Sequence, residues 1–208
     1  VVPGEEFDLN INLHFTSWVF PKGHRVRVAI SNAQWPMLWP TPMQMKSTLA
    51  IGGKNGARFD LPVVPPGENN TPNFKEPSPD PWLSGYEVID YGNITGYAAI
   101  NSIQHDPETS EAFGIATNTG AVRYPWGIER FEEEIVHRTS DENPEHTSVV
   151  GRYKITEELK DRTLDFEQNV EFKSDEENFY LKFHRWVSIN GDLYKEKVWQ
   201  EVIPRDFQ

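Results

Sequence analysis

Cysteine is absent from the 208-residue chain, which excludes disulfides, thiolate catalysis and zinc–cysteine sites. The absence also fits a reducing compartment, so we predict a cytoplasmic location, with a secreted or periplasmic parent protein as the alternative. Apolar runs of the roughly 20 residues that a membrane span needs are missing too, as is a signal peptide at the N-terminus. We therefore expect no membrane partner.

Basic residues are scarce. The chain has 32 acidic and 20 basic residues and a formal net charge of -12, and its lysines and arginines form no cluster. Such a chain repels a phosphate backbone, because nucleic-acid binding depends on concentrated positive charge. We therefore expect no nucleic-acid partner. The chain begins at Val1 without an initiator methionine, and we expect it to be part of a longer protein.

Catalytic motifs are missing as well. The sequence has no G-x-S-x-G nucleophile elbow, and its six histidines are scattered rather than spaced for a zinc protease. The "HDPE" stretch at 105–108 is predicted to be a solvated turn rather than a set of metal ligands. Acidic residues are too numerous for sequence alone to select a catalytic pair, so an enzyme that uses carboxylates stays the weakest alternative. We predict no catalytic residue, no metal site and no cofactor.

Strand patterns, by contrast, fill most of the chain. In "FDLNINLHF", residues 7–15, apolar and polar side chains alternate, as in a strand with one buried face. Similar patterns predict further strands, interrupted by a long surface connection at 65–81 that is rich in proline and poor in apolar residues. These further strands are expected at 25–31, 47–51, 57–63, on both sides of Gly92-Asn93, and at 128–137, 151–157 and 164–172.

Residues 179–204 give the clearest local prediction. Two long alternating segments flank Asn190-Gly191, a dipeptide that accepts positive φ at both central positions of a type I′ turn. A helix at 156–168 is the competing interpretation of "TEELKDRTLDFEQ", but the apolar spacing fits a strand better. Many strands without repeating βα units predict a single antiparallel β-sandwich over 1–208, of jelly-roll (galactose-binding-like) type with long loops.

The seven tryptophans raise a separate question. Trp35-Pro36 and Trp39-Pro40 follow the strand at 25–31, and each proline stiffens the loop that carries its tryptophan. A core or interface role is favoured over a sugar-stacking platform, which would make the chain a stand-alone carbohydrate-binding module. We predict that these four residues form an interface or the edge of a cleft. On that prediction, Trp39→Ala leaves the fold of the chain alone nearly unchanged.

Two segments resemble one family. "FPKGHRVRVAISNAQWPMLWPTP", followed by "ARFDLPVVPP", resembles the C-terminal domain of the cocaine esterase and Xaa-Pro dipeptidyl-peptidase group of serine hydrolases. The end of the chain, "WQEVIPRD" at 199–206, is similar to the long tail of one subset of that group. Both matches occur in the expected order, so the resemblance covers nearly the whole chain and is weakest at 65–81.

The resemblance implies the architecture of the parent. In that family an α/β-hydrolase domain carries the Ser, Asp and His, a helical cap covers it, and a jelly-roll domain without catalytic residues packs against both. This chain resembles that last domain alone, so its implied partner is the catalytic α/β-hydrolase domain of the same polypeptide. The loop at 35–42 is then expected to pack on the catalytic domain or near the substrate cleft.

Overall fold

A computed structural model gives the conformation of most of the chain. It describes residues 2, 4–15, 17–43, 45–65, 67, 72–78, 84–93 and 100–206, with no side-chain description for 100–103. These residues divide into two compact units, Val1–Ser31 and Asn32–Gln208, which are described separately below. Only strands, turns and irregular backbone occur among the described residues, and none of them belongs to a helix that could cross a bilayer.

In the first unit the sequence alternates as in a strand, but the described residues of the unit form no strand. The strands predicted at 7–15 and 25–31 are not found, and the alternating apolar side chains of the first segment, such as Leu9 and Phe15, are 69% and 97% exposed. Alternation specifies which side chains share a face, but a strand also requires a neighbour that bonds its backbone N–H and C=O groups. The described part of this unit supplies no such neighbour.

The second unit begins with irregular backbone. The strands predicted at 47–51 and 57–63 are also not found, although the N–H of Ala57 donates to the carbonyl of Ala50 at 2.9 Å. This bond closes a turn in which Gly52 and Gly53 both have positive φ, of 76° and 71°. Residues 72–78, the described part of the predicted connection, are exposed and irregular.

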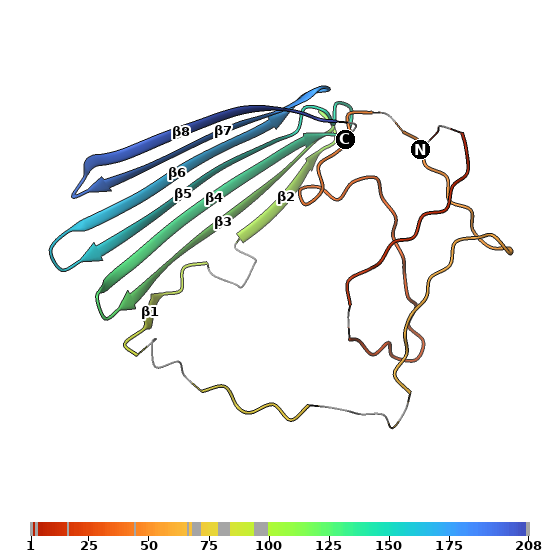
Figure 1. Cartoon of the computed structure of the whole chain (residues 1–208), viewed down its shortest axis with the longest axis horizontal. Coiled ribbons are helices and arrows are strands. Elements are labelled where there is room, and N and C mark those ends of the chain that lie inside the picture. The colour runs from red at the N-terminus through yellow and green to blue at the C-terminus, as the bar shows by residue number, and fades with distance from the viewer. Residues whose placement is uncertain are drawn as a thin grey trace. The chain divides into compact units, whose positions relative to one another are not determined.

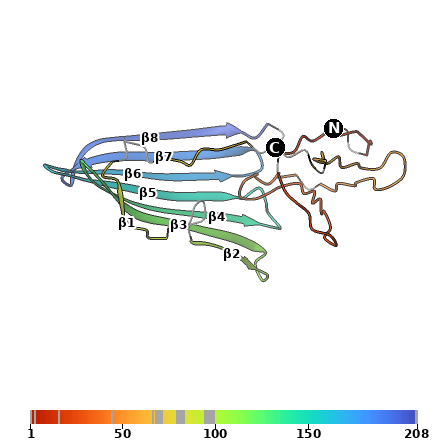
Figure 2. The same cartoon turned by 90° about the horizontal axis from the view of Figure 1, so that it is seen from below.

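Eight antiparallel strands form one open sheet in the second unit (Figure 1). They are β1 (Glu87–Asp90), β2 (Ile100–Asp106), β3 (Glu111–Tyr124), β4 (Gly127–Ser140), β5 (Ser148–Leu159), β6 (Thr163–Ser174), β7 (Asn178–Ile189) and β8 (Asp192–Pro204). From β3 to β8 each strand pairs with the next along the chain, so these six form a meander. Figure 2 shows them side by side.

At the other edge, β1 and β2 share one side of β3. Strand β2 pairs with residues 111–117 of β3, and β1 pairs with residues 121–123. Asn93 lies between the two partners in sequence, and its side chain bonds the backbone of Thr117 and Thr119, at 3.2 and 2.6 Å. The predicted strands on both sides of Gly92-Asn93 are therefore confirmed, while residues 94–99 lie outside the described part.

The helix considered at 156–168 is not found, and a β-hairpin occupies these residues. Residues 156–168 form the end of β5, a short turn and the start of β6, and the turn is closed by a 2.9 Å bond from the N–H of Leu159 to the carbonyl of Arg162. The C-terminal hairpin is confirmed: Asn190 and Gly191 have φ values of 52° and 87°, as a type I′ turn requires. A bulge at Val187/Ser188 shifts the pairing of β7 and β8 by one residue close to this turn.

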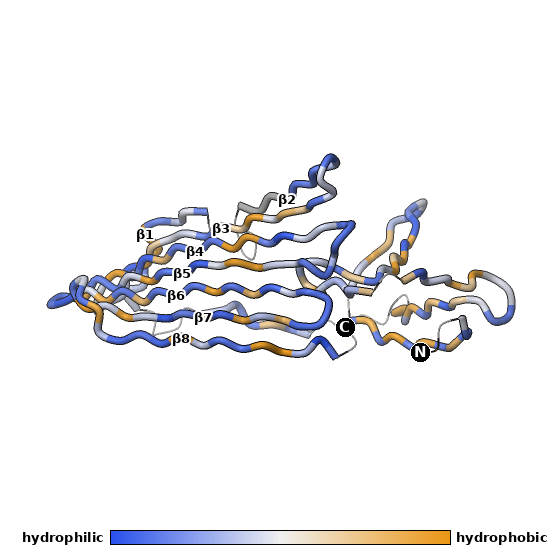
Figure 3. The backbone as a smooth tube through the Cα atoms, turned by 90° about the horizontal axis from the view of Figure 1, so that it is seen from above, coloured by the Kyte–Doolittle hydropathy of each residue, from blue (hydrophilic) through white to orange (hydrophobic). Residues whose placement is uncertain are grey.

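The two faces of the sheet differ in chemistry, as the alternating colours along the strands in Figure 3 show. Residues that pair across strands share a face, so the register places one set of apolar side chains together on what we call the apolar face. Its main members are Phe131, Ile135, Ile155, Phe166, Val170, Phe172, Phe183, Val187 and Trp199. The prediction that Leu164, Phe166, Val170 and Phe172 share a face is confirmed.

The opposite face, which we call the charged face, carries ion pairs. Lys154 lies 3.1 Å from Asp165, which also accepts a 2.7 Å hydrogen bond from Thr156. Burial raises the pKa of Asp165, but the bonds from Thr156 and Lys154 outweigh it and lower that pKa overall. A sheet with one apolar and one charged face is typical of an antiparallel layer that packs on one side only.

The predicted all-β antiparallel class is confirmed, because the described strands form an open eight-stranded sheet that is consistent with a β-sandwich. The jelly-roll strand order and the extent of a single domain over 1–208 stay predictions. Few apolar residues are fully buried: among the described residues only Ala121, Val122 and Phe179 are. The apolar face is thus mostly half-exposed.

Candidate interaction surface

The tryptophan–proline loop packs on one end of the apolar face. The indole N–H of Trp39 donates to the Ser174 hydroxyl at 2.8 Å. Its ring meets Phe172 and Phe179 edge-on, with centroids 5.0 and 5.9 Å away, and those two phenyl rings stack on each other at 5.4 Å. Aromatic rings prefer such edge-to-face contacts, which add to the free energy gained from burying their area. Trp39 is therefore anchored to the sheet of its own chain.

Arg205 fastens the C-terminal tail to the same loop. Its guanidinium donates to the carbonyl of Pro40 and, at 2.8 Å, to that of Asp175, while its carbon centre lies 4.8 Å above the Phe179 ring. The residue is only 3% exposed. Burial lowers the pKa of Arg205, although the charges of Asp175 and Glu145 oppose this effect. A buried guanidinium bonded to two carbonyls holds segments that are 165 residues apart in sequence.

Trp35 occupies a second position at this end of the sheet. A hydrogen bond of 2.8 Å from the N–H of Leu38 to the carbonyl of Gln34 closes a tight turn around Trp35 and Pro36. The indole ring meets the His137 imidazole edge-on at a centroid distance of 5.9 Å, and burial lowers the pKa of His137. The imidazole therefore favours its neutral form, which packs against an aromatic ring without a charge to solvate.

These contacts locate all four residues predicted for the interface. Trp35 and Trp39 are half-buried against the sheet, Pro40 receives the Arg205 bond, and Pro36 is exposed. The contacts revise the expected effect of Trp39→Ala on the chain alone, because the ring packs within the chain. Contact of this loop with a catalytic domain stays a prediction. A sugar platform needs an open indole face and a free N–H, and the observed contacts of Trp39 do not favour that alternative.

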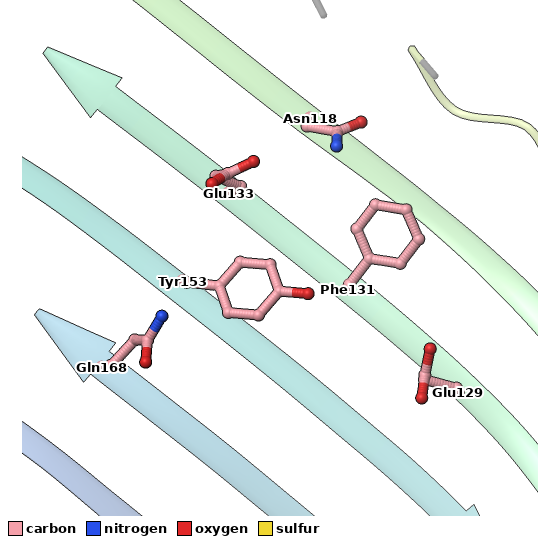
Figure 4. A pocket seen from close by; sticks show the side chains of 6 residues that line it. All are labelled: Asn118, Glu129, Phe131, Glu133, Tyr153 and Gln168. Carbon is pink, nitrogen blue, oxygen red and sulfur yellow. The ribbon is translucent and has the colours of Figure 1, made fainter. Parts of the chain in front are cut away.

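Beyond this loop the apolar face has a polar row across its middle. The register aligns Asn118, Glu133, Tyr153, Gln168, Arg185 and Lys197 on neighbouring strands. The first four of these, with Glu129 and Phe131, line a shallow pocket of about 380 Å³. Figure 4 shows the Tyr153 hydroxyl directed toward Phe131, with Glu133 and Glu129 on either side of them. The apolar face is thus divided into two apolar bands by hydrogen-bonding groups.

The acidic side of this pocket resists deeper burial. Burial, followed by the charge of Glu157, raises the pKa of Glu129. Burial, followed by the charges of Glu129 and Glu133, raises the pKa of Tyr153. Each shift means that the charged form of the side chain is less favourable here than in water. A surface that covers the row therefore has to supply a cation, hydrogen bonds or retained water.

Two histidines and the "HDPE" stretch serve local structure. The turn predicted at 105–108 lies at 107–110, between β2 and β3, because His105 and Asp106 still belong to β2. The His105 ring lies 3.1 Å from Asp141. His184 is paired with Glu196 on the charged face at 3.2 Å. The described residues contain no group of three or more side chains that could hold a metal ion.

Sequence reasoning missed two residues that join the loop to the sheet. Arg205 lies in the tail motif "WQEVIPRD", which carried a family resemblance but no predicted role. Ser174 had no signal at all, yet its hydroxyl accepts the Trp39 bond and donates to the carbonyl of Glu145. Only the pairing of distant segments reveals such a residue, since an isolated serine at the end of a strand has no distinctive pattern.

Comparison with known proteins finds a family that is similar to the N-terminal part of the chain. Residues 1–59 match the family described as the X-Pro dipeptidyl-peptidase C-terminal non-catalytic domain. This segment is similar to a non-catalytic domain. The match confirms the predicted resemblance over those residues, which include the tryptophan–proline loop. No curated protein and no solved structure matches the chain.

Proposed function

We propose that this chain is the non-catalytic C-terminal domain of a serine hydrolase of the Xaa-Pro dipeptidyl-peptidase or esterase type. Its apolar face packs on the catalytic α/β-hydrolase and cap domains and helps to shape the substrate cleft. The observation that carries this proposal is the coincidence of a match to a non-catalytic domain family with a sheet whose apolar face is only half-covered.

The energetics of the apolar face support a covering partner. Complete burial of a Val, Leu or Phe side chain contributes about 1.5–3 kcal/mol relative to full exposure. Side chains that are only partly buried, such as Phe166 and Val187, therefore retain a part of this free energy for a second surface. The two apolar bands are the surface on which we expect the neighbouring domains to pack.

The polar row lies in the part of the proposed domain contact that stays hydrated. Glu129 keeps its charge most easily where water still reaches it, because burial already raises its pKa. The rim of a substrate cleft offers such a position. In this arrangement the apolar bands hold the domains together and the row faces the cleft.

The first test uses the chain alone. We expect no turnover of p-nitrophenyl esters or Xaa-Pro anilides, since acyl transfer requires a nucleophile, a base and oxyanion donors held together. The reading frame upstream of Val1 should encode a G-x-S-x-G elbow followed by Asp and His. Turnover by the purified chain that disappears when one of its own residues is mutated contradicts the proposal.

The second test compares the two faces of β6 in the full-length protein. Phe166→Ser alters the apolar face, and Asn169→Ser is the matched control on the charged face of the same strand. We expect Phe166→Ser to destabilise the full-length protein by at least about 1 kcal/mol more than the isolated chain, and to lower its kcat/KM. Equal losses in both contexts would refute packing through the apolar face.

A further inference from the structure

Strand β8 leaves a long edge without a partner in the described part of the chain. It is the last strand in the sheet order, and its 13 residues are exposed apart from the half-buried Trp199. Val198 and Val202 are 49% and 62% exposed. Such an edge presents a row of unpaired N–H and C=O groups, which another strand can bond.

The sequence of this edge is complementary to itself. Residues 195–201 read "KEKVWQE", and when two copies run antiparallel about Val198 each residue meets one of suitable chemistry. Lys195 then lies opposite Glu201, and Lys197 lies opposite Trp199, whose ring already accepts the Lys197 ammonium within one chain at 4.5 Å. Opposite charges and cation–aromatic pairs stabilise neighbouring strands.

We propose that β8 pairs antiparallel with β8 of a second copy of this chain, with Val198 on the two-fold axis, so that two sheets join into one. The axis is perpendicular to the sheet, so both apolar faces lie on the same side. This arrangement repeats every favourable pair twice. It also places the exposed Val198 against its own copy without burying an unpaired charge.

The neighbouring registers are poorer, which makes the proposed one specific. Centring the pair on Lys197 places Lys195 opposite Trp199 and Glu196 opposite Val198, and it removes the contact with Glu201. Centring it on Trp199 keeps Lys197 opposite Glu201, but it places Lys195 opposite Ile203 and Glu196 opposite Val202. Lysines on an edge strand normally oppose association, whereas the register about Val198 provides each with a partner.

The bulge limits the pairing at one end. Tyr194 is the extra residue of β8 opposite Val187/Ser188, so the regular ladder of this strand begins at Lys195. Seven consecutive residues, 195–201, are therefore available in regular geometry. Bulges near a strand end confine pairing to the part beyond them, which again favours the register about Val198.

A cysteine scan tests the axis directly, because the chain has no cysteine of its own. In Val198→Cys the two introduced thiols lie directly opposite each other, at the roughly 4.5–5.5 Å Cα separation that a disulfide accepts. In Val202→Cys, on the same face of the same strand, the two thiols are eight positions apart, about 27 Å. Mild oxidation should cross-link Val198→Cys into a species of twice the 24.0 kDa chain mass on a non-reducing gel. Equal cross-linking of both variants, or none of Val198→Cys, overturns the proposal.

A charge swap tests the register in solution. Sedimentation equilibrium should show a dimer of the wild-type chain at high protein concentration. Lys195→Glu should weaken dimerisation by about tenfold or more, because two Lys–Glu pairs become Glu–Glu pairs. The double variant Lys195→Glu/Glu201→Lys should restore the dimer, while Lys54→Glu in a distant exposed turn should leave it unchanged. A wild-type monomer at every concentration, or a folded double variant that stays monomeric, refutes the pairing.

Discussion

Replacement of Trp39 separates a role inside the chain from a role only at an interface with another domain. Truncation to alanine removes two edge-to-face ring contacts, one hydrogen bond to Ser174 and the burial of a half-buried indole. Ring pairs contribute about 0.5–1.5 kcal/mol each and a neutral hydrogen bond about 1 kcal/mol. With about 1 kcal/mol for the lost burial, Trp39→Ala should destabilise the chain by about 3–5 kcal/mol.

Two further variants separate the contributions of the ring contacts and the hydrogen bond to this loss of stability. Trp39→Phe keeps an aromatic ring against Phe172 and Phe179 but removes the indole N–H, so it should cost about 1 kcal/mol. The Ser174 hydroxyl keeps its bond to the carbonyl of Glu145, so no buried donor is left unpaired. Trp18→Ala is the control, because Trp18 is 74% exposed and should change the stability by no more than about 0.5 kcal/mol.

Urea unfolding followed by far-ultraviolet circular dichroism measures all three variants without relying on tryptophan fluorescence. The reasoning predicts the order Trp39→Ala, Trp39→Phe, Trp18→Ala, from the largest loss to the smallest. If Trp39→Ala unfolds at the same urea concentration as Trp18→Ala, the loop does not pack on the sheet in solution. The tryptophans would then be free to serve an interface with another domain alone.

Two further predictions concern the type I′ turn at Gly191 and the pocket residue Glu129. Gly191→Val should destabilise the chain by roughly 1 kcal/mol or more, because Gly191 has a φ of 87°, which a β-branched residue occupies poorly, and an unchanged thermal melt would contradict the type I′ turn. Glu129→Gln should stabilise the chain at pH 7, because a raised pKa means that ionisation of Glu129 is less favourable in the folded than in the unfolded state. This gain should vanish as the pH falls below the ordinary glutamate value of 4.5, where Glu129 is protonated in both states, and urea midpoints that differ equally at both pH values would refute it.

The C-terminal half of the fold could be predicted from the sequence because its signals are local. Asn190-Gly191 specifies a turn by its own backbone preferences, and the period-2 pattern of 164–172 specifies which side chains share a face. The same periodicity favoured a strand over the helix alternative at 156–168, and the structure has the end of β5, a turn and the start of β6 there. In this part the neighbours that complete each hydrogen-bond ladder follow directly in sequence, so pattern and structure agree.

The N-terminal part could not be predicted in the same way. Residues 7–15 have as regular an alternation as any strand of the sheet, yet they form no ladder in the structure. The alternation reports a preference of the side chains, whereas a strand exists only when a second strand bonds its backbone. Pattern alone cannot show whether that partner is present.

The antiparallel β class, the terminal hairpin and the absence of cysteine chemistry all follow from the amino-acid sequence alone, as does the similarity of residues 1–59 to a non-catalytic domain family. Tertiary structure decided where the tryptophan–proline loop goes: onto the end of the apolar face, held by Ser174 and Arg205. The physical reason is that hairpins and faces follow from interactions between near neighbours in sequence. The Arg205 contact joins residues 165 positions apart, and only the completed sheet brings them together.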